Sequence, residues 1–169
     1  TIGGWVSMWR PLEIFLYDWW PVRREARLAE KLAIILVQLP PSLAFDPSLA
    51  PRFFSALQRS TKAQIACEPR HASWFDEAPE RWMAEQNIAR VAADPAPVAA
   101  AAVPGGKADF AYWRLHGSPH IYRSSYGEER IEAYAAAMRE RPAAWCIFDN
   151  TASSAATGNA LSLGEALAP

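Results

Sequence analysis

The chain has 169 residues, of which 51% are hydrophobic and 21% are charged, and its formal net charge is −1. This length and composition suit one globular domain. A nearly neutral chain lacks the overall basic field of many nucleic-acid-binding proteins, so nucleic acid is disfavoured as a partner but not excluded. The sequence shows neither a secretory signal nor an apolar run of about 18 residues, so we expect a cytoplasmic protein with no membrane partner.

Residues 1–31 form the first predicted segment. They contain four of the eight tryptophans and show no clean hydrophobic period. We expect an irregular or short helical lead-in, with good helix formers over residues 23–32. Its tryptophans are expected to pack on the domain, and an anchor at a membrane interface is the alternative.

Residues 32–169 form the second predicted segment, a domain in which strands alternate with helices. The expected strands are residues 34–38, 64–68, 89–93, 110–116 and 144–149. The expected helices are residues 46–58, 76–86, 128–140 and 159–167. The expected loops are residues 95–106, 117–127 and 150–158. This alternation predicts right-handed crossovers and a parallel sheet whose strand carboxyl ends meet at one face.

Three of these strands end in clusters of polar, reactive side chains. The clusters are Glu68-Pro69-Arg70-His71, Arg114-Leu115-His116-Gly117 and Asp149-Asn150-Thr151. Because α/β enzymes build active sites at the carboxyl ends of buried strands, we expect the three clusters to converge on one site at that end of the sheet. Gln38 and Asp94 lie at the ends of the other two strands and could add hydrogen bonds.

Glu68 and His71 offer a carboxylate and an imidazole for acid/base chemistry. Burial at a strand end raises the pKa of a carboxyl group and a neighbouring arginine lowers it, and a tuned acid or base needs such competition. The alternative is a structural salt bridge from Glu68 to Arg70 or Arg114. Arg114 and His116 alternate on one strand and therefore face the same side of the sheet. His116 is either part of the site or a core histidine whose hydrogen bonds are satisfied.

The loop over residues 117–127 is rich in serine, tyrosine and arginine. These residue types suit an anion or a sugar. A solvated loop is one alternative, and a nucleic-acid surface with tyrosines stacked on bases is another. The loop over residues 150–158 leads into the last helix, whose free N–H groups near Asn159 could hold a phosphate or carboxylate.

The two cysteines, Cys67 and Cys146, lie inside predicted buried strands. We expect core residues in a reducing compartment, with a disulfide or a catalytic thiol as alternatives. The carboxylates and histidines of the three polar clusters could surround a metal ion, but they lack the HxH or HExxH spacing that would support one. We therefore expect no metal and no cofactor.

Four stretches of the chain resemble one known family. They are VQLPPSLAFDP (37–47), EPRHASWF (68–75), YWRLHGSPHIYRSSYGEE (112–129) and FDNTASSAATGNALSL (148–163). In order and spacing, over about residues 32–167, they are similar to the YecE-like proteins, a family named domain of unknown function 72. The resemblance implies a TIM-barrel fold and no established activity.

The resemblance also implies which residues lie at the strand ends. Carried over to this chain, they are Gln38, Glu68, Arg70, His71, Trp74, Arg114, His116, Tyr122, Tyr126, Asn150 and Asn159. We expect Glu68, His71 and His116 to be catalytic and the others to bind a ligand. Pro69 stands where the family usually has an aromatic residue, and Asp149 stands where asparagine is common.

The largest departure from the family is at the front of the chain. The family begins with a Gly-Thr-Ser-Gly-Trp strand and two more strands, whereas only Gly3-Gly4-Trp5 within residues 1–31 is similar to that start. We therefore expect an α/β fold, a partial TIM barrel of about five parallel strands alternating with helices, which is not closed because a closed barrel has eight. Such a chain would be truncated, internally deleted or completed by another chain, and its exposed edges predict self-association.

Three hypotheses about function follow. In the first, an enzyme-type pocket takes a small anionic or polyhydroxylated ligand, with Glu68 or His71 as the acid or base and Arg114 as the anion clamp. In the second, the same pocket binds a phosphorylated ligand or nucleic acid without turnover. In the third, the chain is an incomplete copy without activity.

Overall fold

The structure is a computed structural model that describes residues 33–168. The predicted lead-in over residues 1–31 and the predicted helix over residues 23–32 lie outside the described residues, as does Gly3-Gly4-Trp5. The prediction of strands alternating with helices can therefore be compared with the structure from Ala33 onward.

Six strands run parallel to their neighbours, and one short strand runs antiparallel. The parallel strands are β1 (Ile34–Gln38), β2 (Gln64–Glu68), β3 (Ile88–Arg90), β4 (Ala92–Asp94), β6 (Ala111–Leu115) and β7 (Ala144–Phe148). The antiparallel strand is β5 (Gly105–Gly106), which pairs with β3. The described strands form two sheets, in the orders β1-β2-β3-β5 and β4-β6-β7.

The five predicted strands are all present, with two differences. The strand expected over residues 89–93 is divided at Val91, so that its first part pairs in one sheet and its second part in the other. Strand β5 lies in a predicted loop, because two glycines carry no apolar pattern. Gly106 has φ +67, and a Cβ there would lie 2.2 Å from the Ile88 carbonyl oxygen, so only glycine fits this pairing.

The helices follow the strands as predicted, with shifted ends. They are α3 (Leu49–Ser60), α4 (Glu77–Glu85), α5 (Glu128–Arg139) and α6 (Ala155–Leu167), with short 3₁₀ turns η2 (Ala72–Phe75) and η3 (Ala99–Ala102). Helix α6 begins four residues before the expected Asn159. None of the helices within residues 33–168 has both the length and the apolar character needed to cross a membrane.

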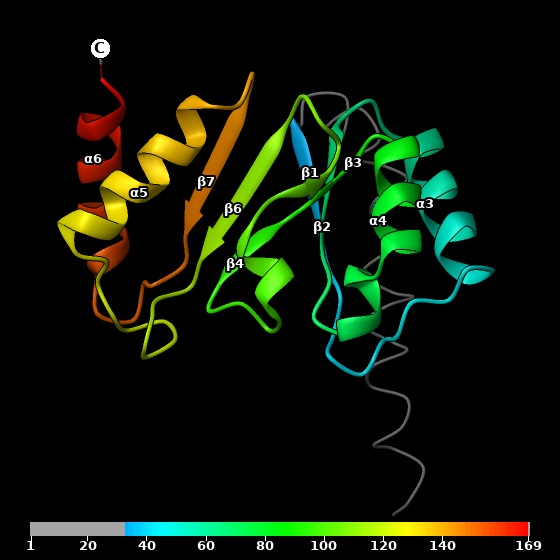
Figure 1. The fold of residues 1–169 in the computed structure, drawn as a ribbon, viewed down its shortest axis with the longest axis horizontal. Helices are drawn as coiled ribbons and strands as arrows, with labels where there is room; N and C mark the ends of the chain where they lie inside the picture. Colours follow the sequence, from blue (N-terminus) through cyan, green and yellow to red (C-terminus); the bar gives the residue numbers. More distant parts are fainter. Residues whose placement is uncertain (1–32, 169) are drawn as a thin grey trace, which may run out of the picture.

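The helices cover one face of the strands in two groups (Figure 1). Helices α3 and α4 pack near β1, β2 and β3 in a core that includes Phe54, Met83 and Ile88. Helices α5 and α6 pack near β6 and β7 in a second core that includes Trp113 and Leu163. Alternation along each strand sends every second side chain into these cores and leaves the others on the opposite face.

The face of the strands opposite to the helices carries a third apolar cluster. Ala66, Ala89 and Tyr112 pack together there. Strands β1 and β7 are the last strands in their sheets, so the described sheets are open, as expected. Trp145 and Ile147 of β7 are exposed on this side of the molecule. Self-association through the open edges stays a prediction.

Candidate functional site

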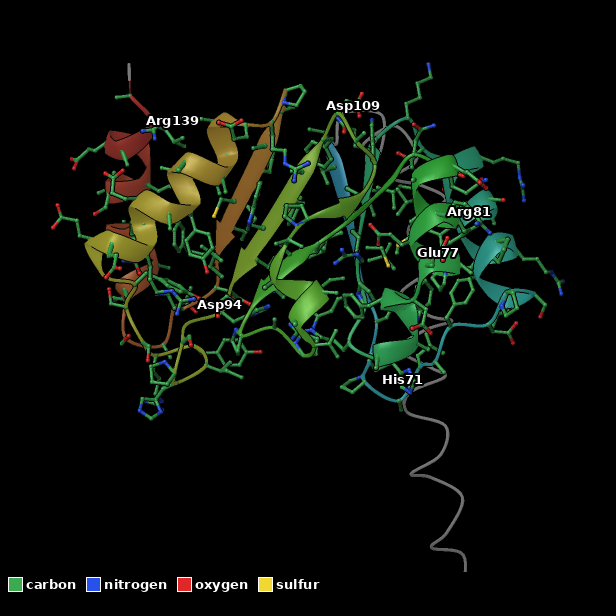
Figure 2. The ribbon with its side chains drawn as sticks, viewed as in Figure 1. His71, Glu77, Arg81, Asp94, Asp109 and Arg139 are labelled. Carbon is green, nitrogen blue, oxygen red and sulfur yellow. The ribbon has the colours of Figure 1, made fainter. Side chains whose placement is uncertain are left out.

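The carboxyl ends of β1, β2, β6 and β7 lie at one edge of the fold. Strands β1 and β2 are paired in register, with Gln38 opposite Glu68, and β6 and β7 are paired with Leu115 opposite Phe148. Figure 2 shows Asp94, the last residue of β4, and His71, which follows β2, at the lower edge, whereas Asp109, which precedes β6, lies at the upper edge. Parallel pairing therefore brings the three polar clusters to the same edge.

Arg114 joins three of the four strand ends through its guanidinium group. Its Nη1 donates to Gln38 Oε1 and to Glu68 Oε2, both at 2.6 Å. Its Nη2 donates to Asp149 Oδ2 at 2.7 Å. The predicted convergence of Arg114 and Glu68 is confirmed, and the predicted salt bridge between them is present as well. The guanidinium group of Arg114 therefore forms its hydrogen bonds with side chains at the ends of three other strands.

His116 lies between two carboxylates and an arginine. Its Nδ1 is 3.1 Å from Asp149 Oδ2, and its Nε2 is 3.1 Å from Glu68 Oε1 and 2.8 Å from Arg70 Nη2. Since an ionised carboxylate only accepts, the Asp149 contact calls for a hydrogen on Nδ1. A neutral ring can then accept from Arg70 at Nε2, and a protonated ring can donate to Glu68. Both ring nitrogens of His116 therefore lie within hydrogen-bond distance of a partner.

The cluster formed by Glu68, Arg70, Arg114, His116 and Asp149 is termed the strand-end cluster. Its two carboxylates balance its two guanidinium groups, and Arg70 also forms an ion pair with Glu68. The side chains of Glu68 and His116 are 1% and 2% exposed, whereas that of Asp149 is 30% exposed. The cluster therefore has a buried floor and a solvent-facing side at Asp149.

Burial and charge oppose each other at Glu68, as the sequence predicts. Burial alone would raise the pKa of this carboxyl group, but hydrogen bonds from His116 and Arg114 and the charge of Arg70 hold the pKa below its ordinary value of 4.5. Burial would lower the pKa of Arg114, but its hydrogen bond to Glu68 and the charges of Glu68 and Asp149 together raise the pKa above its ordinary value. Both groups are therefore charged at neutral pH.

The lowered pKa of Glu68 predicts a specific loss of stability in acid. A carboxyl group whose pKa is lower in the folded chain stabilises the fold above its unfolded pKa of 4.5, and this stabilisation disappears as the pH falls through the lowered value. We expect the free energy of unfolding to fall as the pH drops below about 5, and to fall less steeply in Glu68→Gln. Urea unfolding at each pH measures this.

Glu77→Gln is the matched control for this experiment. Glu77 is solvent-exposed and lies 3.9 Å from Arg81, so the same chemical change there should leave the pH dependence of the parent protein intact. Identical slopes for Glu68→Gln and the parent protein would contradict the assignment of a lowered pKa to Glu68.

His71 does not join the strand-end cluster. Its Nδ1 accepts from the backbone N–H of Ser73 at 3.2 Å and lies 2.9 Å from Ser73 Oγ, so that His71 caps the short turn η2. Strand β2 ends at Glu68, and the chain turns into η2 before it reaches His71. The structure therefore does not bring Glu68 and His71, the two residues predicted as acid or base, together, and it places His116 beside Glu68.

Three other predicted ligand-binding residues hold a loop in place. Asn159 Oδ1 accepts from the Tyr126 N–H at 3.1 Å and from Asn150 Nδ2 at 2.8 Å, and all three residues are buried. The Tyr126 hydroxyl accepts from the Gly117 N–H at 2.8 Å and donates to the Asp94 carbonyl at 3.2 Å. Asn159 lies inside α6, so the expected helix start at this residue was wrong. Their hydrogen bonds fix the loop over residues 117–127 against α6 and the end of β7.

Tyr122 is the exposed aromatic residue of that loop nearest to His116. Its N–H donates to the His116 carbonyl at 2.5 Å, and the two ring centroids are 6.0 Å apart in an edge-to-face arrangement. Its φ of +66 is uncommon for a residue with a bulky side chain, and the hydrogen bond to His116 helps to hold it. Tyr122 is therefore an exposed ring in edge-to-face contact with the buried His116.

Gln38 and Asp94, which were both expected to add hydrogen bonds to the site, differ in the direction of their side chains. Gln38 reaches Arg114 as described, but the Asp94 carboxylate turns to the helix side and binds Arg130 Nη2 at 2.6 Å and the Tyr134 hydroxyl at 3.0 Å. In β4, Asp94 pairs with Leu115 and shares the face that is packed on helices. The expectation that Asp94 adds hydrogen bonds to the site was wrong for its side chain.

Asp149 stood in one of the predicted polar clusters, but the prediction did not select it as a catalytic or ligand-binding residue. The sequence carried a signal for it in the two-residue period of β7, by which Asp149 shares a face with Ile147, and the structure pairs Ile147 with Arg114. A period of two therefore places Asp149 on the face of Arg114 and its neighbour Asn150 on the other face. Asn150 donates to the Ser124 carbonyl at 2.9 Å, on that other face.

Metal and thiol chemistry receive no residues from the described part of the chain. Among residues 33–168, no group of three histidine, cysteine or carboxylate side chains is arranged to hold a metal ion. Cys67 and Cys146 are both free, and burial raises the pKa of each thiol, that of Cys146 to about 12. Cys67 belongs to the core packed on α3 and α4, and the partly buried Cys146 packs against the core on α5 and α6, as expected for core residues.

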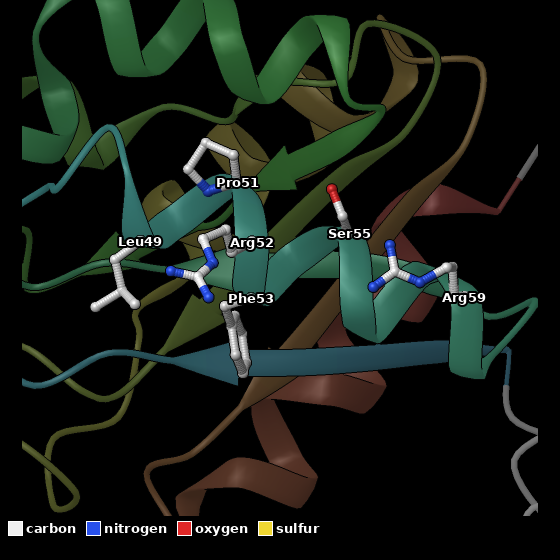
Figure 3. Close-up of a pocket in the computed structure, with 6 residues that line it drawn as sticks. All are labelled: Leu49, Pro51, Arg52, Phe53, Ser55 and Arg59. Carbon is white, nitrogen blue, oxygen red and sulfur yellow. The ribbon is translucent and has the colours of Figure 1, made fainter.

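Two hollows lie beside β1 and α3 rather than over the centre of the strand-end cluster. One, of about 670 Å³, lies along α3 and is shown in Figure 3 with Arg52, Phe53 and Arg59 among its lining residues. The other, of about 390 Å³, lies at the carboxyl end of β1 and is lined by Gln38 and Trp74. Trp74 is buried and donates from Nε1 to the Leu43 carbonyl at 2.9 Å.

Comparison with solved structures finds the same fold in two bacterial proteins. A DUF72 family protein from Enterococcus faecalis superposes with a TM-score of 0.68 and 19% identity, over 86% of this chain and 63% of that one. A DUF72 family protein from Thermotoga maritima gives a TM-score of 0.65 and 24% identity, over 92% of this chain and 64% of that one. The present chain therefore spans less than two thirds of the length of either protein.

Comparison with curated proteins finds no match. A family model described as "Protein of unknown function DUF72" matches residues 17–169, which extends the resemblance seen in the sequence toward the N-terminus. The match covers most of the chain, and it confirms the resemblance to the YecE-like proteins. The chain therefore belongs to the DUF72 family.

Proposed function

We propose that the strand-end cluster binds a small polyhydroxylated ligand, with an anionic ligand as the second form of the same proposal. The observation that carries it is the concentration of four charged side chains and one imidazole at the ends of parallel strands, with Glu68 and His116 almost completely buried. Burying charges is costly, and pairing them often does no more than balance that cost. Such clusters are therefore commonly kept for binding or catalysis.

The charge balance favours hydroxyl groups over a strong anion. Both guanidinium groups already bind carboxylates, so an added phosphate would compete with Glu68 and Asp149 for Arg114. Hydroxyl groups donate and accept, so they can meet the exposed side of Asp149 and the amide of Gln38 together. The Nε of Arg70 is buried and lacks a hydrogen-bond partner among the described residues, and a ligand oxygen would satisfy it.

Within this proposal His116 is the acid/base group, and Glu68 supports it. Asp149 orients the ring through Nδ1, and Nε2 holds or releases the proton beside Glu68 and Arg70. Because the pKa of Glu68 is lowered, its carboxylate stabilises a protonated His116 better than it donates a proton itself. A pocket that binds the same ligand without turnover has the same contacts, and product formation distinguishes the two.

The fold proposed for this site is part of a TIM barrel. The supporting features are parallel strands with helices on one face, polar residues at the carboxyl ends, and an apolar opposite face that includes Tyr112. In TIM barrels the carboxyl-end face carries the ligand site. The strand-end cluster occupies that position.

Nuclear magnetic resonance of the imidazole nitrogens tests the ligand proposal. The chain has three histidines, His71, His116 and His120, so replacing His71 or His120 with glutamine assigns the signals. We expect glucose to shift the His116 signals and leave those of His71 unchanged, and Asp149→Asn to abolish the shift. A response to inorganic phosphate but not to glucose would favour the anionic form. No response to glucose, glucose 6-phosphate or phosphate would overturn the proposal.

A further inference from the structure

A second candidate site adjoins the strand-end cluster at the carboxyl end of β1. It is a cavity of about 390 Å³, enclosed by the end of β1, the chain that leads into α3, the first turns of α3, and Trp74. The residues that line it include Gln38, Leu43, Ala44, Asp46, Phe53 and Trp74. Its volume falls within the range of about 300–1,000 Å³ that small-molecule sites occupy.

The walls of this cavity are hydrocarbon and aromatic rings. The polar atoms nearby are already engaged: the Asp46 carboxylate accepts from the N–H groups of Ser48 and Leu49 at 2.7 and 3.1 Å, and Trp74 Nε1 donates to the Leu43 carbonyl. An occupant would therefore meet apolar surface on most sides. The aromatic rings of Phe53 and Trp74 make flat, polarisable walls that suit an aromatic group.

Gln38 connects this cavity to the strand-end cluster. It lines the cavity, and its Oε1 accepts from Arg114 Nη1 at 2.6 Å. One side chain therefore contacts both the apolar cavity and the guanidinium group that holds Glu68 and Asp149. A ligand could place an apolar group in the cavity and a polar group at the cluster without crossing a wide gap.

The hollow on α3 is a weaker candidate. Its lining residues, which include Leu49, Arg52 and Arg59, all come from that one helix, as Figure 3 shows. One helix surface supplies a single wall, so it cannot enclose a small molecule from several directions. The cavity beside β1 has walls from a strand, a loop, a helix and the η2 turn, as ligand sites usually do.

We propose that the cavity beside β1 binds an aromatic substituent of the ligand whose hydroxylated part lies at the strand-end cluster. The inference rests on the proposed function and narrows the substrate class to polyhydroxylated compounds that carry an aryl group. Gln38 lies at the junction between the two parts of the ligand. Its amide orients the polar part, and the apolar walls take the ring.

Binding of three probes tests this inference: 2-naphthol, glucose, and 2-naphthyl β-D-glucoside, each measured by isothermal titration calorimetry. Ala44 is exposed and lines the cavity, so Ala44→Trp fills the cavity from its rim. We expect this variant to weaken 2-naphthol and 2-naphthyl glucoside by about tenfold or more, which corresponds to losing the burial of roughly two methylene groups. Ala137→Trp, at an exposed position of α5, is the matched control and should bind as the parent protein does.

Further variants separate the two proposals. Phe53→Ala removes an exposed wall of the cavity and should weaken 2-naphthol even if Ala44→Trp fails to fold. Gln38→Leu should keep 2-naphthol binding but abolish the advantage of the glucoside over 2-naphthol. Equal binding of 2-naphthol to the parent, Ala44→Trp and Phe53→Ala proteins, or none to the parent, would overturn the cavity site. Loss of 2-naphthol binding in these variants, with no response of His116 to glucose, glucose 6-phosphate or phosphate, would keep the cavity and overturn the proposed function.

Discussion

Replacing Arg114 with methionine is expected to lower the free energy of unfolding by about 3–5 kcal/mol, the usual cost of removing one partner from a buried ion pair. Arg114 is 13% exposed and binds both Glu68 and Asp149. Methionine keeps much of the apolar stem but leaves the 1% exposed Glu68 with fewer cationic neighbours. Urea unfolding, with the midpoint and the slope reported separately, measures the effect.

Arg81→Met provides the matched control on the surface. The Arg81 side chain is 65% exposed and lies 3.9 Å from Glu77 and 3.8 Å from Glu85. Exposed pairs of this kind contribute about 0–1 kcal/mol, so the control should change the free energy of unfolding far less than Arg114→Met. Similar small losses in both variants would mean that the strand-end cluster is effectively solvated, and the argument from buried charge would fail.

The second large effect is expected for Asn159→Ala, which should lower the free energy of unfolding by about 3 kcal/mol or more. The substitution leaves the buried Tyr126 N–H without its acceptor and removes one of the two hydrogen bonds that the buried Asn150 Nδ2 donates, the other being to the Ser124 carbonyl. Each buried donor left unpaired costs about 1–3 kcal/mol. The loop over residues 117–127 should also loosen, because Asn159 Nδ2 donates to the Tyr126 carbonyl at 2.9 Å.

Urea unfolding and hydrogen exchange of the Tyr126 amide together check this prediction. Thr157→Ala, at an exposed position of the same helix, is the control and should alter neither measurement by much. We expect faster exchange at Tyr126 in Asn159→Ala under conditions in which the whole chain stays folded. Unchanged exchange at Tyr126 would show that Asn159 does not hold the loop, and Tyr126 and Asn150 would again be open to a role in ligand binding.

Arg114→Met and Asn159→Ala test two different groups of residues that the resemblance to the family had placed in one set. The residues carried over as strand-end residues divide into those of the strand-end cluster, such as Arg114, and those that hold the loop, such as Asn159. The family motifs alone do not make this division, because both kinds of residue are polar and lie in or near the segments that end the strands. Asn150 and Asp149 are neighbours, yet the period of two sends one to the loop and the other to the cluster.

The sequence by itself determined the elements and the edge at which the polar residues gather. Apolar runs between helix-forming segments located the strands, and the parallel arrangement followed because crossovers through helices return each strand in the same direction. The pairing of Arg114 and His116 on one face needed only the two-residue period of β6. These features depend on local periodicity, which a sequence carries directly.

Only the tertiary structure decided which of these residues touch. Glu68 pairs with His116 and not with His71, because strand pairing carries β6 to the site while η2 carries His71 away from it. The antiparallel strand β5 and the cavity beside Gln38 likewise depend on segments that are distant in sequence. Contacts of this kind are set by the packing of several elements at once, and no local pattern of residues records them.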